Sequence, residues 1–386
     1  MPTRPIRRAK GAGSIRQRGK GSWQIRYDGP PDANGKITKL SEAVRGSRRD
    51  AEKALRERLG VVEDGSYVAK NKETTAEFLW RWIDTYAATN TSLRTQQGYK
   101  VNVRRVIAHI GAIPLQQLRP QHIQKMYADL VGRGLSAQTV NHTHRTLSEA
   151  LGHGVQWGVL TRNVSSATSA PKPKRQQQQM WDVKTINRFL AVSQDNKYRD
   201  FYHLDILTGL RRSELAGLQW EYVDLPNAQL SVANTLQRID GHGLVEGQPK
   251  TFLSRRLIAV SPRAVALLRS IHRNQLEQRL AVGPLWQDTG YVFTQANGSR
   301  IDPDKATRDF TRIVSKNGLP YLTLQGLRHA HATLLLAAGV HPKIVSERLG
   351  HSNIGITMDI YSHVMPGMQE AAAQSIDDTL AAEGEA

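Results

Sequence analysis

Residues 208–215 read TGLRRSEL, a stretch in which a glycine is followed by two arginines and an acid among apolar residues. Three other stretches stand out beside it: 249–251 (PKT), 324–331 (LQGLRHAH) and 349–352 (LGHS), the last followed by 361–363 (YSH). Each places polar groups where the pattern of a hydrophobic core does not require them. Taken together, the four stretches predict a polar site built from distant parts of the C-terminal half of the chain.

These stretches resemble the catalytic region of the tyrosine recombinases, the phage integrase family. The resemblance extends over the whole chain and implies an arm-type DNA-binding module, a helical core-binding domain and a catalytic domain, in that order. Any one of the motifs is a weak signal. Four motifs in the order and at the spacing of the family are highly specific.

In that family two arginines, a lysine, a histidine and a second histidine or tryptophan surround one phosphate, and a tyrosine attacks it. The resemblance assigns these positions to Arg211, Lys250, Gln325, Arg328, His351 and the nucleophile Tyr361. Gln325 departs from the family, which has a histidine there. Glutamine donates and accepts hydrogen bonds but does not titrate, so an orienting role can carry over whereas a proton-transfer role cannot be assumed.

The chemistry of a phosphodiester explains why such residues would gather. Attack adds negative charge to the non-bridging oxygens, and two fixed guanidiniums can hold these bidentately. No acidic cluster suited to Mg²⁺ stands beside the motifs, so neither a metal nor another cofactor is expected. Attack by Tyr361 would leave a 3′-phosphotyrosine and conserve the bond energy, so that ATP is not needed. Lys250 would protonate the departing 5′ oxygen, and His351 would hydrogen-bond the phosphate.

Some of these residues have simpler interpretations. Arg211 alone could be a solvated helix arginine, and PKT is so short that another lysine could serve in place of Lys250. Tyr321 and Tyr291 are rival nucleophiles, but neither precedes a Ser-His pair. Tyr291 also lies in a strand-like run that is typical of a core aromatic.

The neighbouring histidines His329 and His331 raise the question of a metal site. On a helix the two rings of a His-x-His pair point about 200° apart, so they cannot bind one ion. A packing role is the better interpretation of His329, which also lies one helical turn after Gln325 and could partly substitute for it.

Residues 1–70 form a basic module with 17 Lys+Arg and 8 acids. Alternating apolar and polar residues at 23–28 predict a strand, followed by a second extended stretch at 36–44 and a helix at 47–59 closed by Gly60. A polar sheet face can enter the major groove, so we expect salt-sensitive DNA contacts from Arg16, Arg18, Lys20, Arg26 and Lys39. A solvated charged face is the alternative.

The rest of the chain is mostly helical in pattern. Residues 75–168 contain four helical segments, with Ser136 as a helix N-cap, and predict a compact bundle. The Pro-rich and Gln-rich stretch 169–179 has nothing to bury and indicates a linker. Beyond it, helical patterns such as 201–218 and 303–316 alternate with short extended stretches such as 291–294.

The composition fits a DNA partner and an intracellular setting. The chain has 53 Lys+Arg against 34 Asp+Glu, a formal net charge of +19, which favours a polyanionic partner. It has no cysteine, which excludes disulfides, thiolate nucleophiles and Cys-ligated zinc or iron–sulfur sites. The longest apolar run, 332–340, is too short to span a bilayer, so we expect a protein of the bacterial cytoplasm or nucleoid.

The expected fold is multidomain α+β. It combines a small N-terminal β-sheet plus helix module, an all-α core-binding bundle, and a mostly α catalytic domain with a small antiparallel sheet. The expected segments are 1–70 (arm-type DNA binding), 75–168 (SAM-like core binding), 169–179 (linker), 180–365 (catalytic) and 366–386 (a tail that by resemblance contacts a neighbouring subunit).

The implied function is site-specific recombination of double-stranded DNA with core and arm-type sites, which integrates or excises a mobile element. It implies a tetramer on DNA, with a DNA-bending accessory protein as a further candidate partner. Two alternatives stay open. The first is a DNA-binding protein of the same architecture that does not cleave, suggested by Gln325. The second is a DNA-relaxing enzyme of topoisomerase IB type, which the arm-type module disfavours because relaxation does not need it.

Overall fold

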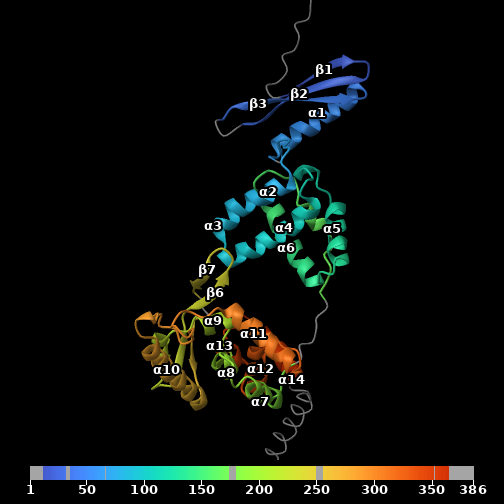
Figure 1. The fold of residues 1–386 in the computed structure, drawn as a ribbon. Coiled ribbons are helices and arrows are strands. Elements are labelled where there is room, and N and C mark those ends of the chain that lie inside the picture. The colour runs from blue at the N-terminus through green and yellow to red at the C-terminus, as the bar shows by residue number, and fades with distance from the viewer. Residues whose placement is uncertain are drawn as a thin grey trace, which may run out of the picture. The chain divides into compact units, whose positions relative to one another are not determined.

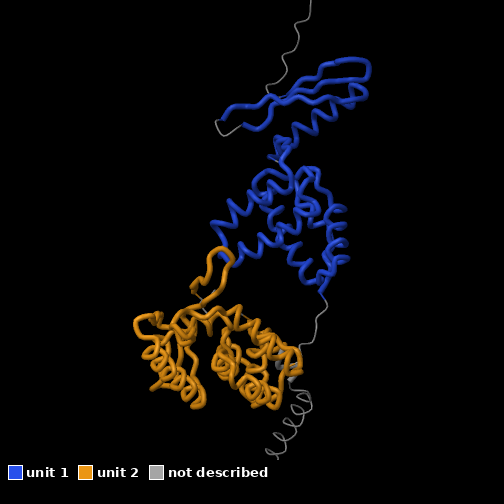
Figure 2. Tube along the Cα trace, in the orientation of Figure 1, with its two compact units in different colours: residues 1–175 blue, residues 176–386 orange. Residues whose placement is uncertain are grey.

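The computed structural model describes residues 12–31, 35–65, 67–173, 180–248, 255–351 and 353–364. The chain divides into two compact units, residues 1–175 and 176–386 (Figure 2). Lys250, the predicted tail 366–386 and residues 174–179 of the predicted linker lie outside the described residues. The expected mixed class with small antiparallel sheets is confirmed. The finer division into five segments stays a prediction.

The first part of unit 1 is a three-stranded antiparallel sheet packed on one helix (Figure 1). Its elements are β1 (Ser14–Gly19), β2 (Ser22–Pro31), β3 (Ile37–Arg45) and α1 (Arg48–Glu63). Ile25 and Tyr27 of β2 pack against Ala51 and Leu55 of α1. The predicted stop at Gly60 is wrong, because α1 continues to Glu63. Leu59 and Val62 pack against this cluster, and their burial offsets the cost of about 1 kcal/mol for a helical glycine.

The second part of unit 1 is the helical bundle (Figure 1). It contains α2 (Thr75–Trp82), a π-helical turn η1 (Ile83–Ala87), α3 (Ala88–Asn90), α4 (Leu93–Ile110), η2 (Leu115–Gln117), α5 (Pro120–Gly132), α6 (Ala137–Gln156) and η3 (Val164–Ala167). Large side chains including Phe78, Trp82 and Tyr127 form its core. Ser136 is confirmed as the N-cap of α6, since its side chain accepts a hydrogen bond from the Thr139 amide.

Unit 2 is mostly helical with two small antiparallel sheets, ordered β4-β5-β8 and β6-β7. Its helices are α7 (Val183–Val192), α8 (Arg199–Thr208), α9 (Arg212–Ala216), α10 (Pro262–Val282), α11 (Pro303–Lys316), α12 (Leu324–Ala337), α13 (Pro342–Leu349) and α14 (Gly355–Val364), with short turns η4 (Trp220–Tyr222) and η6 (Gly283–Leu285). Its strands are β4 (Val223–Asp224), β5 (Gln229–Val232), β6 (Thr235–Ile239), β7 (Gly243–Gly247) and β8 (Arg256–Ala259). In the described ranges, no helix of either unit is long and apolar enough to cross a membrane.

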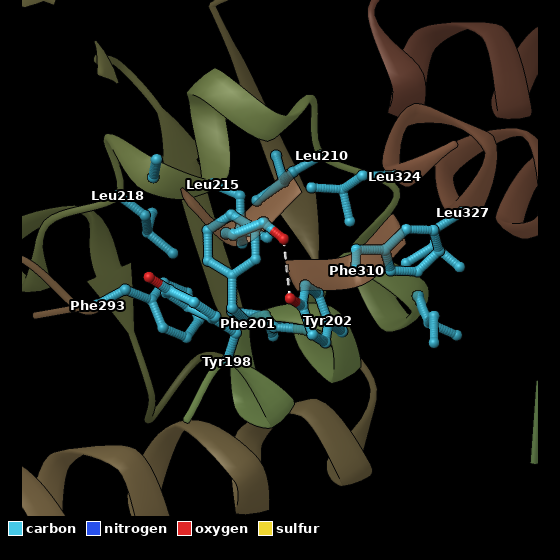
Figure 3. Close-up of a cluster of buried hydrophobic side chains, with 14 of the residues drawn as sticks. Tyr198, Phe201, Tyr202, Leu210, Leu215, Leu218, Phe293, Phe310, Leu324 and Leu327 are labelled. Atoms are coloured by element: carbon cyan, nitrogen blue, oxygen red, sulfur yellow. Dashed lines mark hydrogen bonds between the residues drawn. The ribbon is translucent and has the colours of Figure 1, made fainter. Parts of the chain in front are cut away.

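One hydrophobic core anchors two of the polar stretches of unit 2. Leu210 and Leu215 come from the stretch 208–215, and Leu324 and Leu327 come from the start of α12. Figure 3 shows these four side chains in the same buried cluster as Tyr202 and Phe310. Because the apolar residues of both stretches are buried together, the arginines between and beside them are brought to one region.

Two sequence-based predictions for unit 2 are wrong. The segment 201–218 is not one helix, because α8 ends at Thr208 and α9 begins at Arg212. The stretch 291–294 is not a strand; it makes only isolated bridges, from Tyr291 to Gln219 and from Thr294 to Arg300. Its aromatic and β-branched residues reflect burial in the core rather than pairing in a sheet.

Candidate active site

The stretch 208–215 folds as a tight reversal followed by a short helix. Gly209 ends α8 with a left-handed φ of 64°, and Arg211 then becomes the N-cap of α9. The carboxylate of Glu214 accepts hydrogen bonds from the Arg211 backbone nitrogen at 3.0 Å and from its Nη1 at 2.6 Å. The glycine therefore turns the chain out of α8, and the glutamate fixes the arginine that follows.

The Gly209→Ala variant is expected to lose stability. An added Cβ would lie 2.6 Å from Cδ2 of His331 and 2.8 Å from Cδ2 of Leu349. Left-handed backbone costs a non-glycine residue about 1–2 kcal/mol, and overpacking adds about 1–3 kcal/mol. Urea denaturation followed by circular dichroism measures the sum. Gly241→Ala is the matched control, because Gly241 has a φ of 77° but open space around it. Equal losses in the two variants would contradict the close packing at Gly209.

Three arginines converge on three consecutive carbonyl groups at the end of α13. Arg256 Nε donates to the carbonyl of residue 348 at 2.6 Å, Arg328 Nη2 to that of 349 at 2.5 Å, and Arg211 Nη2 to that of 350 at 2.7 Å. The last carbonyls of a helix have no intrahelical partner and carry its partial negative charge. The C-terminus of α13 therefore gathers positive side chains from α12, β8 and the start of α9.

Glu214 holds two of these arginines from the other side. It is 3% exposed and accepts hydrogen bonds from Arg211 and, at 3.0 Å, from Arg256 Nη2. Burial disfavours its charge, but the hydrogen bonds and charges of Arg256 and Arg211 hold the pKa of Glu214 below its ordinary value. Glu214 is therefore an ionised anchor of the cluster.

Arg328 is the most enclosed arginine of the cluster. It is 2% exposed, and its Nη1 donates to the Gly209 carbonyl at 2.7 Å. Burial, together with the charges of Arg211 and Arg256, lowers the pKa of Arg328 to about 9. The guanidinium stays protonated at neutral pH but lies close to like charges, so an anion bound among these arginines would relieve their repulsion.

His351 follows directly after the carbonyls that collect the arginines. Gly350 ends α13 in left-handed conformation, and the half-buried His351 comes next, with Nδ1 2.8 Å from Oγ1 of Thr357. Burial and the charges of Arg328 and Arg211 lower the pKa of His351 to about 4. At neutral pH it is therefore an uncharged ring that can donate one hydrogen bond.

The structure thus brings Arg211, Arg328 and His351 together. Gln325 is exposed on the first turn of α12, three residues before Arg328. Tyr361 lies on α14, which packs against α12 and α13; only its backbone is described. The position of Lys250 lies outside the described residues.

The two rival tyrosines have different surroundings. Tyr291 is 2% exposed in the core of unit 2, and burial, followed by the nearby Glu246 carboxylate, raises its pKa to about 12. Such a phenol is neither accessible to DNA nor easily ionised. Tyr321 is 74% exposed, just before α12.

Sequence reasoning did not single out Arg256 as part of the cluster. Its partners, Glu214 and the carbonyl of residue 348, are 42 and 92 residues away along the chain. The local signal is an arginine at the first position of a strand, two residues before the buried Ile258, and this pattern is too common to identify a site.

The histidines of α12 have structural partners. His331 is buried between the carbonyl of Ile206, 2.8 Å from its Nδ1, and Arg348, whose Nε donates to its Nε2 at 3.1 Å. His329 is half-buried, and burial followed by the charge of Arg328 lowers its pKa. Among the described residues, no group of three His, Asp or Glu side chains could hold a metal ion.

The basic residues predicted to contact DNA in the front module are all exposed. Ile25 and Tyr27 face α1, so Gln24 and Arg26 of β2 lie on the opposite face of the sheet. Residues paired across strands share a face, which places Arg16 beside Gln24 and puts Lys39, paired with Asp28, on that face too. One open face of the sheet therefore carries positive charge.

A second basic surface lies in the helical bundle. A groove of about 640 Å³ between α4 and α6 is lined by Arg94, Arg105 and Arg145, together with polar residues such as Thr95 and Thr139. The sequence motifs did not identify this surface, because its residues come from two helices and become neighbours only after folding.

Two family models match the chain. The model described as the phage integrase family matches residues 179–367, and the model described as the phage integrase N-terminal SAM-like domain matches residues 74–131. Among curated proteins, a "tyrosine recombinase XerC-like" protein of Caldanaerobacter subterraneus subsp. tengcongensis is 26% identical, with 93% of this chain and 97% of that protein covered. The ICEBs1 integrase of Bacillus subtilis is 27% identical, with 69% and 72% covered.

Solved structures show the same fold. The Tn1549 transposon integrase in complex with transposon right end DNA matches with a TM-score of 0.68 at 23% identity, over 79% of this chain and 99% of that chain. A lambda integrase tetramer bound to a Holliday junction matches with a TM-score of 0.57 at 17% identity, over 92% of this chain and 96% of that one.

Proposed function

The chain belongs to the phage integrase family, and from that premise we propose that it is a site-specific DNA recombinase that cuts and rejoins DNA strands through a 3′-phosphotyrosine intermediate. Its reaction integrates or excises a mobile element. The observation that carries the proposal is the cluster of Arg211, Arg328 and His351 at the end of α13.

The cluster has the chemistry that phosphoryl transfer requires. A guanidinium has five N–H donors, and the contacts described above engage two on Arg211 and two on Arg328. The remaining donors can hold the non-bridging oxygens of a phosphate, and the neutral His351 can add one hydrogen bond. Because these groups are fixed before DNA arrives, they stabilise the charge that develops during attack.

The remaining roles follow the family pattern. The Tyr361 oxygen would form the new bond to phosphorus while the bond to the DNA 5′ oxygen breaks, and Lys250 would protonate that oxygen as it leaves. Gln325, one turn before Arg328, would orient the phosphate through its amide. The arrangement of α12 and α14 around the end of α13 supports these roles.

DNA would be held by both parts of unit 1. The positive face of the β1-β2-β3 sheet, carrying Arg16, Arg18, Arg26 and Lys39, would bind arm-type sites together with Lys20 of the β1-β2 turn. The basic groove between α4 and α6 would bind the core site. Recombination joins two duplexes and needs four active sites, so we infer a tetramer on DNA, aided by a DNA-bending protein. A DNA substrate supports the further proposal that the protein acts in the bacterial cytoplasm or nucleoid.

A nicked suicide substrate, on which cleavage cannot reverse, tests the proposal. We expect a covalent protein–DNA adduct that peptide mass mapping places at residue 361. If no adduct forms, the chain is instead a DNA-binding protein of the same architecture that does not cleave DNA. Relaxation of supercoiled DNA without a defined site would instead favour the topoisomerase IB alternative.

Restoring the family residue with Gln325→His is expected to accelerate cleavage of the suicide substrate or leave it unchanged. The position is exposed on the first turn of α12, so an imidazole can be accommodated and would add a group that titrates near neutral pH. Single-turnover cleavage rates measure the effect across about pH 6 to 8, the range in which a histidine side chain changes charge. A large loss of rate would show that the site depends on the glutamine amide.

A further inference from the structure

A buried hydroxyl on the helix of the nucleophile contacts the histidine of the arginine cluster. Thr357 is 0% exposed and lies on α14, four residues before Tyr361. Its Oγ1 is 2.8 Å from Nδ1 of His351, which precedes α14 in the chain. Because the hydroxyl is enclosed, water does not compete for this hydrogen bond.

The contact determines which nitrogen of His351 faces away from α14. Since Nδ1 is occupied by Thr357, Nε2 is the nitrogen left for a phosphate. A neutral imidazole carries one proton, so Nε2 can donate to an anionic oxygen only if Nδ1 is the acceptor. The opposite tautomer would present a lone pair to the phosphate and repel it.

We propose that Thr357 is a positioning residue for cleavage: its hydroxyl donates to Nδ1 of His351 and thereby keeps the proton on Nε2, where it can be donated to the scissile phosphate. The inference rests on the proposed function, because that function supplies the phosphate. It also links two parts of the site. Tyr361 follows Thr357 by about one helical turn. Displacing α14 would therefore remove the nucleophile and also remove the hydrogen bond that fixes the tautomer of His351.

Cleavage rates separate this role from simple packing. Thr357→Val keeps the shape but removes the hydroxyl. We expect it to slow single-turnover cleavage about 10- to 100-fold, by analogy with the loss of a group that orients a metal-binding histidine. Thr357→Ser retains the hydroxyl and should retain most of the rate. Thr333→Val on α12 is the matched control, because among the described residues the Thr333 hydroxyl is buried without a hydrogen-bond partner. It should cleave like the wild type.

A double-mutant cycle tests the mechanism. In a His351→Gln background, the side-chain amide donates to the phosphate and has no tautomer, so adding Thr357→Val should cause little further loss. If Thr357→Val costs the same factor in both backgrounds, its effect is structural and the proposal is overturned.

The tautomer itself can be measured without any cleavage. Nitrogen NMR of the full chain labelled with ¹⁵N-histidine should show Nε2 protonated and Nδ1 unprotonated for His351, a signal identified by its loss in His351→Gln. In Thr357→Val both tautomers should appear. A proton on Nδ1 in the wild type would overturn the inference about Thr357. If the NMR result is as expected but no covalent adduct forms with the suicide substrate, the proposed function is overturned instead.

Discussion

Tyr361→Phe is expected to bind DNA like the wild-type chain and to form no covalent adduct with the nicked suicide substrate. Phenylalanine keeps the ring and the helical propensity of α14 but lacks the oxygen that bonds to phosphorus. Loss of a nucleophile removes activity on the order of 10⁶-fold. Adduct formation is followed on denaturing gels, and DNA affinity by fluorescence anisotropy at one fixed salt concentration, since affinity varies steeply with salt.

The control for this variant is Tyr321→Phe. Tyr321 is 74% exposed and is the accessible rival, whereas Tyr291 is buried. We expect Tyr321→Phe to form the adduct at the wild-type rate. If the adduct persisted in Tyr361→Phe and disappeared in Tyr321→Phe, Tyr321 would be the nucleophile and the role given to α14 would be wrong.

Hydrophobic periodicity and capping residues predicted the helices whose ends are determined by nearby residues in the sequence. The helix expected at 303–316 matches α11, where Asp302 caps the first turn and Phe310 and Ile313 face the core. The break within 201–218 could not be predicted from periodicity, because apolar residues continue with helical spacing across Gly209. The turn is stabilised from elsewhere: Arg328 donates to the Gly209 carbonyl, and the ring of His331 leaves no room for a side chain at Gly209.

The same distinction applies to the candidate site. The sequence motifs named Arg211, Arg328 and His351, and folding brings these three together. The motifs could not show that consecutive carbonyls at the end of α13 accept hydrogen bonds from these arginines. Every residue has a backbone carbonyl, so the sequence does not indicate which carbonyls are acceptors. Arg256 and Thr357 are common residue types whose importance comes from hydrogen bonds to partners that the fold supplies.

The neighbouring arginines Arg211 and Arg212 offer the sharpest test of the cluster. Arg211 joins Glu214 and the carbonyl of residue 350, whereas Arg212 Nη1 donates to Asp304 at 2.7 Å and to Thr307 at 2.8 Å, on α11. Arg211→Ala is expected to slow cleavage about 10²- to 10³-fold, the usual effect of removing one donor to the transition state. Arg212→Ala should cleave at nearly the wild-type rate and lose at most about 1 kcal/mol of stability.

Each of these two variants removes one positive charge at adjacent positions, so the general attraction of the chain to DNA falls by the same amount. Any difference in cleavage rate therefore reports a local contact. We expect Arg211→Ala to stay folded, because Glu214 keeps its pairing with Arg256 when the Arg211 side chain is removed. Thermal unfolding of both variants checks that a difference in cleavage rate does not come from a loss of stability. Equal losses of cleavage rate in Arg211→Ala and Arg212→Ala would mean that the rate depends on total charge. The proposal that the phosphate binds at the end of α13 would then be wrong.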